Sequence, residues 1–70
     1  METYKLTGWH KVERVRATLI PDTTEAKFLS ALDKLHRRKA LMNFEDLRVC
    51  IYEPGRGQNM PLSFYQQRKP

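Results

Sequence analysis

The chain has 70 residues, 40% hydrophobic and 30% charged, and its 13 Lys and Arg against 8 Asp and Glu give a net charge of +5. This length excludes a multidomain protein and the apolar content excludes wholesale disorder, so we expect one small folded domain over residues 1–70. The positive charge favours anionic partners such as nucleic acid or an acidic protein.

Targeting signals are not expected in this sequence. The first twenty residues contain charged side chains from Lys5 to Arg16, which excludes the apolar core of a signal peptide. No apolar stretch approaches the roughly 20 residues that a membrane span requires. The single cysteine, Cys50, cannot form an intramolecular disulfide. These features predict a cytoplasmic protein without a membrane partner.

The N-terminal third is predicted to be extended. Residues 4–7 and 14–20 alternate with the period of strands, and Gly8 interrupts the first run. Val12 and Val15 have opposite parity and cannot both face the core in one regular strand. We therefore expect either two strands or one bent strand, with a break or bulge near Glu13.

A helix is predicted next. Pro21 ends the extended run, and Glu25 follows Asp22 at the spacing of a capping box, so the helix is expected to begin at Asp22. An apolar stripe then recurs at helical spacing. It predicts a buried face that ends near residues 36–38 and consists of Phe28, Leu29, Leu32, Leu35 and His36.

The C-terminal third is predicted to form a hairpin. Alternation in residues 47–52 predicts a strand, and two glycines with a proline in residues 53–59 predict a loop. A last strand is expected over residues 60–65, with Phe64 inward and Tyr65 outward. Pro61 would make it an edge strand, and residues 66–70 would be a flexible tail.

This order of elements predicts an α+β fold. A single helix is expected to pack on one face of a three- or four-stranded, mainly antiparallel sheet, in the order β(β)-α-β-β. A chain this short covers only one sheet face, so the other face should be exposed.

The exposed sheet face is the first candidate site. It is expected to be basic and aromatic, because arginines can bind phosphates and tyrosines can stack on unpaired bases. The same composition is typical of protein interfaces, including homodimers, and a plain solvated surface is also compatible with it. The expected residues are Arg14, Arg16, Arg48, Tyr52 and Tyr65, with Trp9 if the first hairpin folds over.

The second candidate site is the outer face of the helix. Residues 34–39 form the densest basic run, and Lys27 lies on the same helix face as Lys34 and Arg38, with Arg37 nearby. This face could lie along a phosphate backbone or dock on an acidic protein. A simpler interpretation is a solvated helix face in which Asp33 and Arg37 form a local ion pair.

Other chemistry is not indicated by any motif. Arg56 lies between two glycines, but the glycine patterns of nucleotide-binding loops are absent, so a flexible turn is expected. His10, His36 and Cys50 lack metal-site spacing. We expect no metal, no cofactor and no catalytic residues, and therefore a non-enzyme.

The leading hypothesis is a small basic module that binds nucleic acid non-catalytically through the exposed sheet face, assisted by Lys34, Arg37 and Arg38. The alternative is an adaptor or inhibitor that binds a protein partner, or a homodimer, through the same face or an edge strand.

Overall fold

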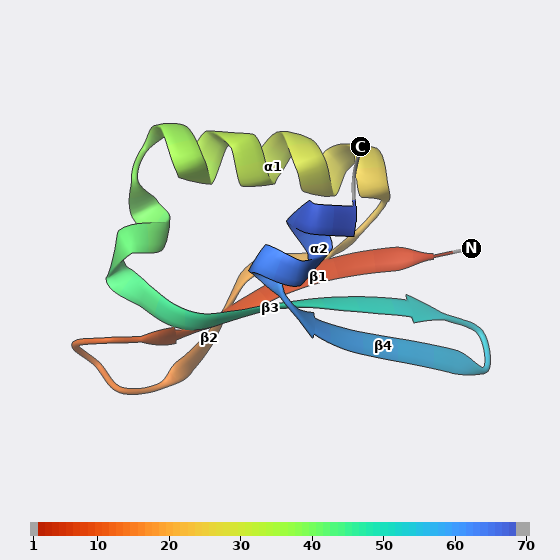
Figure 1. Cartoon of the computed structure of the whole chain (residues 1–70), viewed down its shortest axis with the longest axis horizontal. Helices are drawn as coiled ribbons and strands as arrows, with labels where there is room; N and C mark the ends of the chain where they lie inside the picture. The colour runs from red at the N-terminus through yellow and green to blue at the C-terminus, as the bar shows by residue number, and fades with distance from the viewer. Residues whose placement is uncertain (1, 69–70) are drawn as a thin grey trace.

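The computed structural model describes residues 2–68. Its four strands form one antiparallel sheet in the order β2-β1-β3-β4, and both helices lie on the same side of it (Figure 1). The fold is therefore α+β, as predicted, with one main helix and a second, short helix that was not expected. The elements are β1 (Thr3–His10), β2 (Arg16–Thr23), α1 (Glu25–Arg37), the 3-10 helix η1 (Ala40–Asn43), β3 (Phe44–Glu53), β4 (Arg56–Pro61) and α2 (Leu62–Arg68).

The first hairpin turns later than Gly8. β1 continues through Gly8 to His10, and the turn that follows contains Arg14 with a left-handed φ of 57°. Gly8 is instead a point of close packing, where an added Cβ would lie 2.8 Å from the Leu47 side chain and 3.2 Å from the Phe44 Cβ. The break expected near Glu13 is confirmed as this turn, and the glycine permits the contact between β1 and the start of β3.

The start of α1 differs from the prediction. β2 runs through Pro21 to Thr23. A proline is tolerated there because β2 is an edge strand. Thr24 is the N-cap, and its hydroxyl oxygen accepts a hydrogen bond from the Lys27 amide at 3.4 Å. Asp22 is therefore not the cap, and Glu25 is the acidic residue of the first helical turn.

The apolar stripe of α1 is confirmed in part. Phe28 and Leu32 are buried in the core and Leu35 packs against it. Leu29 remains 41% exposed, and His36 is exposed. The buried face is therefore narrower than the sequence predicted.

The second hairpin and the end of the chain differ most from the prediction. The turn is confined to residues 54–55, and β4 already begins at Arg56. The strand expected over residues 60–65 is confirmed only for Met60 and Pro61, which end the edge strand β4, and it is wrong for residues 62–65, because α2 begins at Leu62. The predicted tail also starts inside this helix, and its residues 69–70 lie outside the described residues.

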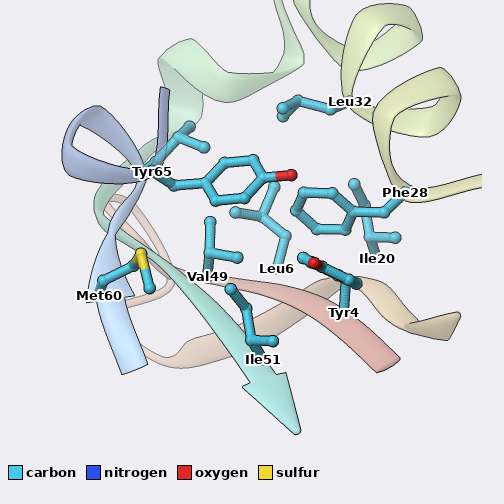
Figure 2. Packing of buried hydrophobic residues seen from close by; sticks show 10 residues of the cluster. Tyr4, Leu6, Ile20, Phe28, Leu32, Val49, Ile51, Met60 and Tyr65 are labelled. Carbon is cyan, nitrogen blue, oxygen red and sulfur yellow. The ribbon is translucent and has the colours of Figure 1, made fainter. Parts of the chain in front are cut away.

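The core lies between the sheet and the two helices, and three aromatic rings meet in it (Figure 2). The ring centroid of Tyr4 lies 5.7 Å from that of Phe28 and 6.1 Å from that of Tyr65, and the latter two are 5.8 Å apart. The Tyr65 hydroxyl donates to Glu25 Oε2 at 3.2 Å. This cluster joins β1, α1 and α2. The apolar residues buried with it are Leu6, Ile20, Leu32, Val49, Ile51, Met60 and Leu62.

The Tyr4 hydroxyl makes the free energy of unfolding decrease with pH in the alkaline range. Burial raises the pKa of Tyr4 from 10.0 to about 12, and the carboxylates of Glu25 and Glu2 add to this increase. Between these pH values the unfolded chain loses the proton that the folded chain keeps, so stability present below pH 10 is lost as pH rises toward 12. Over this interval, we expect the free energy of unfolding of Tyr4→Phe to fall by about 2 kcal/mol less than that of the unsubstituted protein. Urea unfolding at a series of pH values measures the difference, and parallel pH profiles would contradict the prediction.

Candidate functional site

The uncovered side of the sheet carries three of the predicted residues. Strand register places Arg16 opposite Trp9, Arg48 opposite Thr7, and Tyr52 opposite Thr3. These β1 positions have the opposite parity to Tyr4 and Leu6, which face the core. The open face, as used below, comprises Thr3, Lys5, Thr7, Trp9, Arg16, Thr18, Asp22, Glu45, Asp46, Arg48, Cys50, Tyr52, Gly57 and Asn59.

Two predicted residues are not on this face. Arg14 lies in the turn between β1 and β2, because β1 extends farther than Gly8 suggested. Tyr65 is buried in the core with an exposed fraction of 3%, because residues 62–68 are helical and a helix does not alternate sides as a strand does. The prediction that Tyr65 lies on the exposed sheet face with Tyr52 is therefore wrong.

Asp46 forms ion pairs with Arg16 and Arg48, the two predicted arginines that lie on the open face. Its Oδ2 lies 2.5 Å from the Arg16 guanidinium, and its Oδ1 lies 3.2 Å from Nε of Arg48. Arg16 also donates to the Thr7 hydroxyl at 3.2 Å, and Arg48 donates to the Asn59 side chain at 3.2 Å. One carboxylate thus partly neutralises both guanidinium groups and fixes their orientation.

Asp46 was missed by reasoning from sequence alone, which predicted a strand only over residues 47–52, whereas β3 begins at Phe44. It adopts a left-handed φ of 50° inside β3, and β1 and β3 change register nearby. Its position two residues before Arg48 was the available signal, because such residues share a sheet face.

The charges of the open face balance. The face has three cationic side chains, Lys5, Arg16 and Arg48, and three carboxylates, Asp22, Glu45 and Asp46. A shallow groove of about 390 Å³ crosses it beside Lys5, Asp22 and Tyr52. The Cys50 thiol lines this groove and accepts a hydrogen bond from the Asn59 amide at 3.3 Å. This face is amphipathic and aromatic, but it is not basic.

The positive charge instead gathers at one end of the molecule. At the C-terminal end of α1, Arg38 caps the helix and Lys39 turns the chain into η1 with φ 57°. The Lys11 amide in the first hairpin donates to the Asn43 carbonyl at 3.0 Å, which ties that turn to η1. These elements lie together at the left of Figure 1. We call the set the basic end: Lys11, Arg14, Lys34, Arg37, Arg38 and Lys39, all of which are exposed.

The basic end retains most of its charge. Arg37 pairs with Asp33 at 2.9 Å, as the sequence predicted, but both side chains are largely exposed, so the pair is weak. Within the described part of the chain, Lys11, Arg14, Lys34, Arg38 and Lys39 form no ion pair with a carboxylate. The opposite end of the sheet differs, since Arg56 lies 3.8 Å from Glu53.

Across residues 2–68, no group of three or more His, Cys, Asp or Glu side chains is placed to hold a metal ion. None of the helices described is both long and apolar enough to cross a membrane. Comparison of the chain with models of protein families, with curated proteins and with solved structures found no match.

Proposed function

We propose that this chain is a small, non-catalytic module that binds nucleic acid through phosphate contacts at its basic end. The observation that carries the proposal is the concentration of six exposed cationic side chains, from two separate segments, against two carboxylates in the same segments, Glu13 and Asp33. Such a surface attracts a polyanion and releases its condensed counterions on binding.

The open face supports this role less well than the basic end. A phosphate approaching Arg16 or Arg48 would compete with Asp46, which already binds both guanidinium groups. Tyr52 is 59% exposed and could stack on a base. Stacking by one residue contributes less than several phosphate contacts, so the proposal assigns the affinity to the basic end.

The geometry of the basic end is compatible with a phosphate backbone. Lys34 and Arg38 are separated by one turn of α1, a rise of about 6 Å, which is similar to the spacing between successive phosphates of an extended single strand. The turn of the first hairpin, anchored to η1 through Lys11, supplies cations from a second direction. Contacts of this type position a backbone without reading its sequence, so we propose binding with little sequence preference.

The salt dependence of oligonucleotide binding tests the proposal. If about four phosphates are contacted, raising salt from about 50 to 200 mM should weaken binding roughly 100-fold. Fluorescence anisotropy with single-stranded and double-stranded oligonucleotides measures this effect. A lack of binding to both forms at the lower salt concentration would overturn the proposal and would favour an acidic protein partner.

Two matched variants locate the contact. We expect Arg38→Gln to weaken binding roughly 10-fold and to reduce the slope of log affinity against log salt concentration by about 1. The double variant, Arg38→Gln with Lys34→Gln, should reduce this slope by about 2. Arg56→Gln removes the same charge at the other end of the sheet and should change affinity less than about 3-fold, because screening limits its reach. Equal losses in Arg38→Gln and Arg56→Gln would contradict a contact at the basic end.

A further inference from the structure

We infer that the open face of the sheet binds a second copy of this chain. Among the described residues, both helices lie on the other side of the sheet (Figure 1), so the open face is uncovered in the monomer. The inference concerns a different surface from the basic end and does not rest on the proposed function.

The charge distribution favours a second copy as the partner. Two molecules that each have a net charge of +5 repel one another, most strongly through their basic ends. The open face is the side on which this repulsion is smallest, because Lys5, Arg16 and Arg48 are matched by three carboxylates there. Nucleic acid or a strongly acidic protein would meet no net positive potential on the same face.

The side chains of this face are suited to burial against another protein surface. Tyr52 is 59% exposed and Trp9 is half-buried, and both residue types are enriched at protein interfaces. Arg16 and Arg48 already bond to Asp46, so part of their charge would remain compensated on burial. Their fixed orientations also reduce the entropy lost on association.

The size of the face indicates a weak dimer. The four strands have 6 to 10 residues. With strands spaced about 4.8 Å apart and rising about 3.3 Å per residue, the sheet has an outline of roughly 500 Å² per copy. The area buried on the two copies together, roughly 1,000 Å², is below that of standard specific interfaces and is typical of weak, transient ones, so we expect a dissociation constant of about 10 to 100 µM. Because the same face is used twice, the dimer would have two-fold symmetry.

Sedimentation velocity over about 5 to 500 µM protein tests this inference, because these concentrations bracket the expected dissociation constant. The average mass should rise from that of an 8.3 kDa monomer toward twice that value. A sample that remains monomeric at the highest concentration would overturn the inference.

Two variants identify the surface. Tyr52→Asp places a charge on the open face, and we expect it to weaken association at least about 10-fold. Phe64→Asp is its control, because Phe64 is 53% exposed on α2, on the side of the sheet that the helices occupy. We expect this control to dimerise like the unsubstituted chain. Loss of association in Phe64→Asp alone would place the interface elsewhere and would contradict the inference.

A third variant covers the case in which Tyr52→Asp impairs folding. Lys5→Glu leaves the aromatic residues in place and makes the open face net acidic on both copies, so it should weaken the dimer by like-charge repulsion. Circular dichroism verifies that each variant is folded. Unchanged association of folded Lys5→Glu and folded Tyr52→Asp would exclude the open face as the interface.

Discussion

Replacing Phe28 with alanine is expected to lower the free energy of unfolding by about 3 to 5 kcal/mol. Phe28 is fully buried, and its ring contacts those of Tyr4 and Tyr65, so its removal opens a cavity where three elements meet. A domain of this length is expected to have a total stability of about 4 to 10 kcal/mol. The variant should therefore lose a large part of the stability of the domain.

Leu29→Ala is the matched control for this prediction. Leu29 belongs to the same predicted apolar stripe but is 41% exposed, so we expect its truncation to cost less than about 1 kcal/mol. Urea unfolding followed by circular dichroism compares the two variants. Similar losses for both would show that the helix is oriented differently and would contradict the packing of α1 described above.

The periodic segments of the fold were predictable from sequence. Alternation in residues 47–52 correctly placed Val49 and Ile51 toward the core, and helical spacing correctly placed Phe28 and Leu32. These signals succeed because burial of one face requires a fixed period in a strand or a helix. The strand order β2-β1-β3-β4 was not predictable, since periodicity carries no information about which strands are neighbours.

The errors occurred where local chemistry was ambiguous. Asp22 and Thr24 are both good N-caps, and the capping-box spacing favoured Asp22, but pairing of Thr23 with Tyr4 keeps the chain extended to Thr23. Gly8 was interpreted as an interruption, yet its lack of a side chain allows the Leu47 side chain to pack against β1. In both cases tertiary contacts determined the outcome.

The candidate site was predicted in composition but not in arrangement. Arg16, Arg48 and Tyr52 do share a sheet face, as their parity indicated. The sequence did not show that Asp46 neutralises the two arginines, because that ion pair requires the register of β1, β2 and β3 together. The exposure of Lys34, Arg37 and Arg38 was predictable from helical spacing. The proximity of the first hairpin to η1 was not, because it depends on a contact between Lys11 and Asn43, 32 residues apart.

Replacing Tyr65 with alanine is the second substitution expected to have a large effect. Tyr65 is buried, its ring packs edge-on against Tyr4 and Phe28, and its hydroxyl donates to Glu25. We expect a loss of about 3 to 5 kcal/mol in the free energy of unfolding. Tyr65→Phe keeps the ring and removes only the hydrogen bond, so it should cost about 1 to 2 kcal/mol.

The neighbouring residue Phe64 distinguishes helix from strand at this position. In a strand, Leu62 and Phe64 would face the core and Tyr65 would be exposed. In α2, Leu62 and Tyr65 are separated by nearly one helical turn, so these two residues face the core instead. Phe64 is 53% exposed, so Phe64→Ala should cost less than about 1 kcal/mol, as measured by urea unfolding. If Phe64→Ala instead lowered the free energy of unfolding more than Tyr65→Ala, residues 62–65 would continue the hairpin as a strand. The aromatic cluster would then lack the contribution of Tyr65 from α2.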